Sequence, residues 1–151
     1  MFLAQVNVAK LLAPLDDPTM SGLRKGLPDV FWLADQSAGF VWRHPPPDDH
    51  PLIYRPLDGT EVVVTLSVWM DFAALQRYVY RTAHGLFMQR RQRWFEPVGG
   101  FNTALWWVPD DERPTVDEGM ARLKLLRELG PTPQAFSLRR QFDPDGGRVI
   151  V

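Results

Sequence analysis

The stretch "EVVVTLSVW" at residues 61–69 is the strongest strand signal in the chain, because it is rich in β-branched residues. Side chains alternate between the two faces of a strand. One face of this stretch is entirely apolar: Val62, Val64, Leu66 and Val68. The other is mixed: Val63, Thr65, Ser67 and Trp69. The pattern therefore predicts a strand with one face in a core and polar groups on the other.

The same alternation recurs near the start of the chain. In "FLAQVNV" at 2–8, an apolar face (Phe2, Ala4, Val6, Val8) alternates with a mixed one (Leu3, Gln5, Asn7). Composition and flanking turn residues predict three further strands, at 40–44, 103–108 and 135–142.

Three helical regions separate these strands. The first runs to about Ala38, and Pro28 predicts either two pieces or a new start there. The second begins after the N-cap Asp71 and runs to about Phe95. The third has a capping-box spacing between Thr115 and Glu118 and ends at Gly130. We expect a mobile Pro-rich loop at 45–51 and a frayed or edge-added tail at 143–151.

The element order is β-α-β-β-α-β followed by an extra helix and strand. Its first six elements follow the ferredoxin-like order, in which helices cover one face of an antiparallel sheet. The sequence therefore predicts an α+β fold and a single domain over residues 1–151. It leaves one apolar sheet face in need of cover, which favours a homodimer.

Composition excludes several classes of protein. A 45% hydrophobic and 23% charged chain is typical of a globular domain. The net charge of −1 gives no general attraction to nucleic acid or anionic membranes. No run of about 18 apolar residues predicts a membrane span, and the first residues do not resemble a signal peptide. Cytoplasmic localisation is the expectation, and no cysteine is present for a disulfide or thiolate site.

Aromatic and polar strand residues are the candidate ligand-binding groups. A cavity for a flat apolar ligand is one interpretation, and a core with a dimer interface is the other. The candidates are Gln5, Asn7, Phe31, Trp32, Trp42, Ser67, Trp69 and Trp106.

His84 is the candidate proton carrier, because imidazole titrates near neutral pH and His84 flanks the apolar stripe of its helix. A purely structural histidine is the alternative. Tyr80 and Arg43 are candidates for holding a developing oxyanion. His44, Asp48, Asp49 and His50 surround the proline run, but prolines extend the chain there and we predict no metal site.

Several segments resemble one bacterial family across almost the whole chain. They are "GFVWR" at 39–43, "SVW" at 67–69, "VYRTAH" at 79–84, "RRQRWF" at 90–95, "LWWVP" at 105–109 and "GPTPQAF" at 130–136. These segments are similar to the DUF3291 family of the dimeric α/β-barrel superfamily. Phe31 and Trp32 depart from the family pattern, which has an asparagine beside a small residue there.

The resemblance implies a homodimer in which two sheets form a barrel, with a cavity between each sheet and its helices. Relatives in the superfamily include cofactor-free monooxygenases, cyclases and isomerases of biosynthetic pathways, which implies transformation of a small aromatic metabolite without a cofactor. Haem-degrading relatives imply an alternative, with His84 as the axial ligand and Arg81 and Arg91 near the propionates. A third alternative is a non-catalytic dimer that binds a ligand or only itself.

Overall fold

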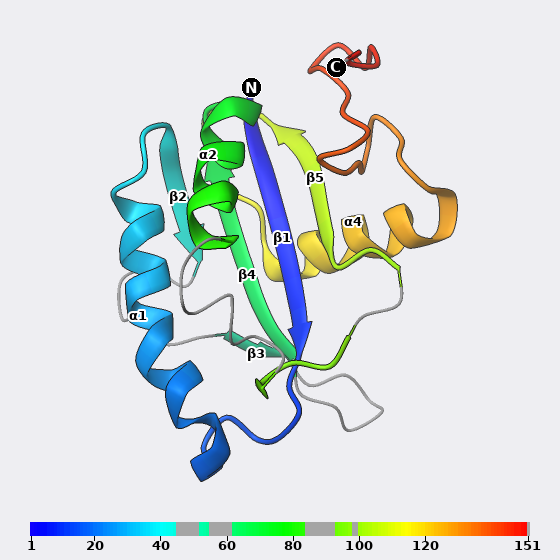
Figure 1. The fold of residues 1–151 in the computed structure, drawn as a ribbon. Coiled ribbons are helices and arrows are strands. Elements are labelled where there is room, and N and C mark those ends of the chain that lie inside the picture. Colours follow the sequence, from blue (N-terminus) through cyan, green and yellow to red (C-terminus); the bar gives the residue numbers. More distant parts are fainter. Residues whose placement is uncertain (45–51, 55–61, 84–92, 98–99, 151) are drawn as a thin grey trace.

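The strand β1 (Phe2–Lys10) lies at the centre of an antiparallel sheet (Figure 1). The computed structural model describes residues 1–44, 52–54, 62–83, 93–97 and 100–150. The other described strands are β2 (Phe40–His44), β3 (Leu52–Tyr54), β4 (Val62–Trp69) and β5 (Thr103–Val108). Their order is β2-β4-β1-β5, and the short β3 also pairs with β4.

The register of the sheet places polar residues of neighbouring strands side by side. Gln5 of β1 lies opposite Ser67 of β4, and Asn7 lies opposite Thr103 of β5. Directly opposed residues of an antiparallel pair share a face. The mixed face that the sequence predicts is therefore continuous across three strands.

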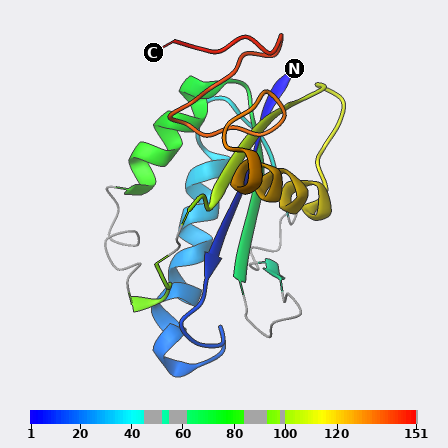
Figure 2. The ribbon, with the colours of Figure 1, turned by 90° about the vertical axis from the view of Figure 1, so that its right-hand side faces the viewer.

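Helices cover both faces of the sheet. The helices among the described residues are the short η1 (Pro18–Met20), α1 (Ser21–Asp35), α2 (Phe72–Ala83) and α4 (Val116–Leu129). Figure 2 shows α1 and α2 on one side of the sheet and α4 on the other. The fold is thus a mixed α+β arrangement of three layers.

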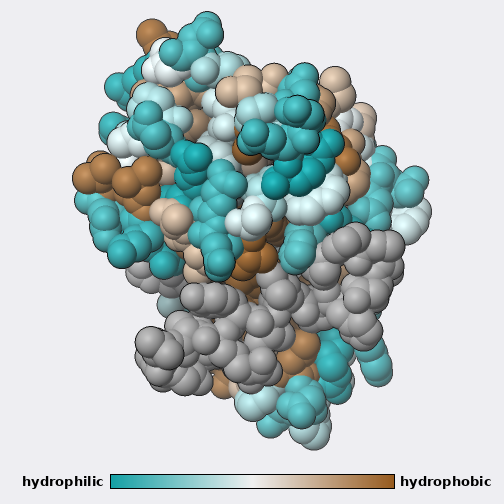
Figure 3. All heavy atoms as spheres, turned by 180° about the vertical axis from the view of Figure 1, so that it is seen from behind, coloured by the Kyte–Doolittle hydropathy of each residue, from teal (hydrophilic) through white to brown (hydrophobic). Residues whose placement is uncertain are grey.

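The apolar face of the sheet packs against α4. Leu123 and Leu126 of α4 are fully buried in a core with Val6 and Leu66. Gly119 allows this close approach, because an added Cβ would lie 3.1 Å from Val6 and 3.4 Å from Leu66. Seen from this side, the described surface is mainly hydrophilic, with hydrophobic residues in separate patches (Figure 3). Where α4 lies, the sheet face is covered within one subunit, so no open face there favours a homodimer.

The mixed face packs against α1 and α2. Trp69 and Leu105 are fully buried there with Leu75 of α2. Gly39 precedes β2 with a φ of 84°, and an added Cβ would lie 2.4 Å from the Cβ of Ala74. Only glycine fits both this backbone conformation and this contact with α2.

Most of the predicted elements are confirmed. Strands occur at the predicted places around 2–8, 40–44, 61–69 and 103–108. The N–H of Ala74 donates to the carboxylate of Asp71 at 2.8 Å, and the N–H of Glu118 donates to the hydroxyl of Thr115 at 3.1 Å. Both predicted N-caps are thus present, and Gly130 ends α4 with a φ of 72°.

Two helix predictions are wrong. The expected interruption at Pro28 does not occur, since α1 is continuous from Ser21 to Asp35. Pro28 lies on the exposed side of the helix, where water can bond the carbonyl that proline leaves without a partner. The predicted helix does not reach Phe95, which instead forms a β-bridge with Leu11, while Trp94 is buried beside α1.

The prediction of a strand at 135–142 is also wrong. Only isolated bridges form there, between Thr132 and Ala135, between Leu105 and Phe136 and between Phe142 and Arg148. The described residues of the tail, 143–150, form no regular strand. The tail folds back on itself, since the N–H groups of Asp145 and Gly147 both donate to the carboxylate of Asp143.

Two further sequence expectations concern the loops and the membrane. The short strand β3 was not predicted, because three apolar residues between prolines carry little periodic signal. The Pro-rich loop at 45–51 lies outside the described residues. None of the helices in the described part of the chain has the length and apolar character that a bilayer span requires.

Two buried tryptophans provide a matched test of this packing. The indole N–H of Trp69 donates to Ser67 at 2.9 Å, whereas that of Trp106 is buried without a hydrogen-bond partner. We expect Trp69→Phe to lower the free energy of unfolding by about 1–2 kcal/mol more than Trp106→Phe, because only the first change breaks a hydrogen bond. Urea denaturation of both variants measures the difference. An equal or larger loss in Trp106→Phe contradicts it.

Candidate functional site

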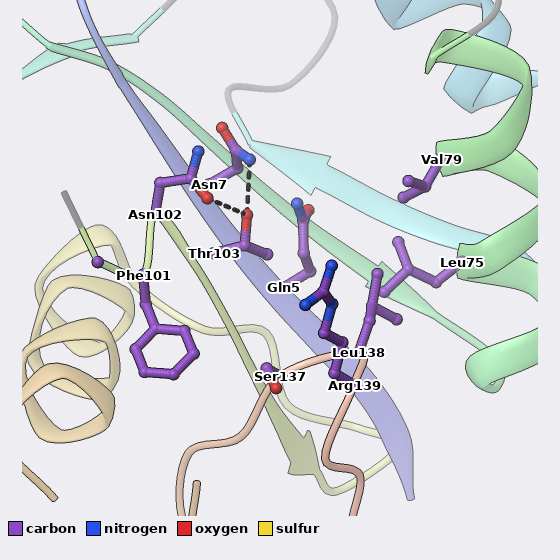
Figure 4. A pocket seen from close by; sticks show the side chains of 11 residues that line it. Gln5, Asn7, Leu75, Val79, Phe101, Asn102, Thr103, Ser137, Leu138 and Arg139 are labelled. Carbon is purple, nitrogen blue, oxygen red and sulfur yellow. Dashed lines mark hydrogen bonds between the residues drawn. The ribbon is translucent and has the colours of Figure 1, made fainter. Parts of the chain in front are cut away.

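A cavity of about 520 Å³ lies between the mixed face of the sheet, α2 and the C-terminal segment (Figure 4). Its volume falls within the range of small-molecule sites. The described residues that line it are Gln5, Asn7, Leu75, Val79, Gly100, Phe101, Asn102, Thr103, Ser137, Leu138 and Arg139. Strands β1 and β5 form its floor, and the side chains of Leu75 and Val79 form the wall on the α2 side.

Gln5 is the most constrained polar group of the cavity. The indole N–H of Trp69 donates to the hydroxyl oxygen of Ser67 at 2.9 Å, and the Ser67 hydroxyl donates to Oε1 of Gln5 at 2.6 Å. Indole is only a donor, so the single hydroxyl proton of Ser67 is left for Gln5. This chain of bonds fixes the orientation of the Gln5 amide.

The amide nitrogen of Gln5 therefore faces away from Ser67. Gln5 is only 8% exposed, and no described residue accepts a hydrogen bond from its amide nitrogen. This nitrogen is not one of the fully buried atoms that lack a partner, so it is accessible from the cavity. The cavity thus presents an oriented N–H₂ group that a ligand with an acceptor oxygen would satisfy.

Asn7 and Thr103 form a second polar pair on the cavity floor. The Asn7 amide donates to the Thr103 hydroxyl at 2.7 Å, and that hydroxyl lies 3.4 Å from Oδ1 of Asn102 (Figure 4). These bonds leave the Asn7 amide oxygen available as an acceptor. The floor therefore carries both a donor and an acceptor.

The C-terminal segment closes the cavity opposite α2. Backbone bonds of 2.9 Å in both directions join Phe136 to Leu105 of β5, and the indole N–H of Trp107 donates to the Phe142 carbonyl at 2.7 Å. The residues between these two anchors include Ser137, Leu138 and Arg139 of the cavity wall. The anchors hold this wall against the sheet although it contains no regular secondary structure.

A cluster of aromatic and charged side chains lies beside Trp69 on the same face. The Tyr78 ring stacks on the Trp69 ring with centroids 4.9 Å apart. Arg43 forms a two-point ion pair with Asp35, at 2.7 and 3.1 Å, and its guanidinium lies 4.9 Å from the centre of the Phe31 ring. Asp35 thus supplies the partner that a charged strand residue needs, and a role of Arg43 in holding an oxyanion stays a prediction.

Burial raises the pKa of the Tyr78 phenol to about 12. The positive charge of Arg43 opposes this rise in pKa, and the negative charge of Asp35 adds to it. Tyr78 is therefore a neutral hydrogen-bond donor at physiological pH, directed at the carbonyl of Val30.

Some predicted site residues lie far from this cavity. Trp42 and Trp106 belong to the opposite face of the sheet, in the core beneath α4. Trp32 is 62% exposed on α1, and Tyr80 is 67% exposed beside a separate surface groove on α2. Of the candidates, the structure brings Gln5, Asn7, Ser67 and Trp69 together at or beneath the cavity, with Phe31 and Arg43 in the neighbouring cluster.

Other predicted residues lie outside the described part of the chain. They are His84, with its alternative roles as proton carrier, structural histidine or haem ligand, Arg91, and Asp48, Asp49 and His50. Over the described residues, no three potential metal-ligating side chains gather at one place.

The sequence did not single out Thr103, Ser137 or Arg139 as site residues. Thr103 could have been found from its position at the start of a strand, once β5 was paired with β1. No local pattern points to Ser137 and Arg139, because their place depends on how the C-terminal segment crosses the sheet.

A family model described as "Domain of unknown function (DUF3291)" matches residues 2–150. The chain belongs to the DUF3291 family. No curated protein and no solved structure matches this DUF3291 chain significantly. The site of this DUF3291 protein must therefore be interpreted from its own residues.

The raised pKa of Tyr78 predicts a loss of stability at high pH. Below pH 10 the phenol is neutral in both states. Between pH 10 and 12 it ionises more readily in the unfolded chain, so the free energy of unfolding falls, by up to about 2–3 kcal/mol for this group. Denaturation at pH 9 and pH 11 measures the fall. We expect this fall in the free energy of unfolding to be smaller in Tyr78→Phe. It should be unchanged in Tyr80→Phe, which removes an exposed phenol. Equal falls in the two variants would contradict the assignment of the effect to Tyr78.

Proposed function

We propose that this DUF3291 protein binds a small, largely apolar or aromatic molecule with an acceptor oxygen in the cavity between α2 and the sheet. The main support for this proposal is the amide of Gln5. The hydrogen bonds from Trp69 to Ser67 and from Ser67 to Gln5 direct its nitrogen away from the core. A donor held in one orientation at the cavity surface supports recognition of a carbonyl, phenol or carboxyl oxygen.

The composition of the cavity wall supports the apolar part of this ligand. Val79 and Leu138 supply hydrophobic surface, and Val79 is 37% exposed, whereas Leu75 behind them is fully buried. A ligand in the cavity would remove this surface from water, which favours binding by about 25 cal/mol for each Å² buried.

We also propose that the ligand is transformed there without a cofactor, by cyclisation, isomerisation or oxygenation. Arg139 is the only charged side chain among the described lining residues. A proton carrier must therefore come from elsewhere, and His84, which follows α2 directly in the sequence, stays the candidate. If His84 plays no such part, the cavity serves to sense or store its ligand.

The ferredoxin-like order is the finer fold proposal. The strand order β2-β4-β1-β5, with antiparallel neighbours and with α1 and α2 on one face, supports it. The homodimeric barrel is a separate proposal, and α4 now occupies part of the face on which the two sheets would meet. The mass of the native protein in solution tests the dimer.

The binding proposal is tested with a neutral probe, 2-acetylnaphthalene, by isothermal titration calorimetry. We expect Val79→Trp to abolish binding, because the larger ring fills the cavity from α2. Tyr80→Trp is the matched control, since the neighbouring Tyr80 lies on the other groove of the same helix and its change leaves the cavity open. Gln5→Met should weaken binding of the ketone about two- to tenfold by removing one hydrogen bond. Failure of the wild-type protein to bind the probe, or equal binding by both tryptophan variants, would refute the proposed site.

A further inference from the structure

We infer that the ligand of this cavity is an organic acid, whose carboxylate is held by Arg139 and the Gln5 amide while its apolar body contacts Val79 and Leu138. This inference rests on the proposed binding function and adds the charge of the ligand to it. It follows from the charges of the cavity wall, from the way Arg139 is positioned and from the balance of hydrogen-bond donors.

The described cavity wall carries one positive charge and no negative one. Arg139 is its only charged side chain, and no aspartate or glutamate belongs to the described lining. Within the described part of the chain, no carboxylate or carbonyl accepts a hydrogen bond from the Arg139 guanidinium. A bound anion would therefore not compete with a partner from the protein.

The fold directs Arg139 to the cavity through the backbone on both sides of it. Phe136 is bonded to Leu105, and the Phe142 carbonyl is bonded to Trp107, so both ends of the segment are fixed to β5. Between them, the N–H of Arg140 donates to the Ser137 hydroxyl at 3.2 Å and closes a tight turn. Figure 4 shows the Arg139 side chain extending from this turn over β1, on the side where Gln5 lies.

The polar groups at the Arg139 end of the cavity are mainly hydrogen-bond donors. Gln5 offers its amide N–H₂, because its oxygen is taken by Ser67. Ser137 accepts from the backbone of Arg140, so its hydroxyl proton is available to donate. Together with the guanidinium they form a set of donors that matches the two acceptor oxygens of a carboxylate.

A carboxylate fits this set better than a phosphate. A phosphate monoester carries about 1.5 to 2 negative charges at pH 7. The cavity offers one guanidinium, which is itself exposed, and a largely apolar remainder. The wall therefore suits a ligand that carries one negative charge on an apolar or aromatic body.

The test compares two probes of similar shape, 2-naphthoate and the neutral 2-acetylnaphthalene. We expect the wild-type protein to bind naphthoate about five- to tenfold more tightly, since a charge-assisted hydrogen bond is stronger than a neutral one. Arg139→Gln should remove this preference while keeping the affinity for the ketone. Arg140→Gln is the matched control: the adjacent arginine is equally exposed but does not line the cavity, and its loss should keep the preference.

Calorimetry at low and high salt adds a second readout. The affinity for naphthoate should fall with salt in the wild-type protein, whereas the affinity for the ketone should not, because only the charged probe is screened. Circular dichroism confirms that both arginine variants are folded.

The possible results distinguish failure of the organic-acid inference from failure of the proposed binding function. If the ketone binds but naphthoate binds no more tightly, or if both arginine variants keep the preference, the organic-acid inference is overturned and the binding function stands. If neither probe binds the wild-type protein, the binding function itself fails and the inference falls with it.

Discussion

The alternation of side chains along β1 determines what each layer of the molecule does. Ala4 and Val6 lie on one face and build a dry core with α4, whereas Gln5 and Asn7 lie on the other and meet the cavity. A shift of one residue in the register would exchange these faces, burying the amides under α4 and turning valines toward the cavity. The pairing of β1 with β4 on one side and β5 on the other prevents such a shift. Position of the site and stability of the core thus depend on the same hydrogen-bonded register.

The polar chain from Trp69 through Ser67 to Gln5 shows how a buried side chain can be given one orientation. Each member satisfies the next: indole has only a donor, the hydroxyl has both functions, and the amide oxygen receives the last proton. Trp106 lacks any such partner for its indole nitrogen on the opposite face. The two tryptophans have similar burial but different surroundings, and only one of them contributes to the geometry of the cavity.

Local patterns predicted the parts of this protein that are determined locally. The strand at 61–69, the caps at Asp71 and Thr115 and the two faces of β1 follow from alternation and capping chemistry, which need only a few neighbouring residues. The same alternation placed Gln5, Asn7 and Ser67 on the mixed faces. The errors occur where distant contacts dominate: Phe95 leaves its helical pattern to bridge Leu11, and Phe136 alone of the predicted last strand forms a β-bridge with β5. The sequence did not identify Arg139 for this reason, because its position depends on the contacts that hold Phe136 and Phe142 against β5.

The cavity joins residues from distant parts of the sequence, with Gln5 on one wall and Arg139 on another. During synthesis on the ribosome, β1 emerges long before the segment that completes the wall, so no earlier partly folded chain contains the finished site. Closing so long a loop is entropically costly. A molecule that binds the finished site and not the unfolded chain stabilises the whole fold by mass action. Ligand binding and stability against unfolding are therefore coupled in this protein. The C-terminal part of the cavity wall, which is synthesised last, couples them.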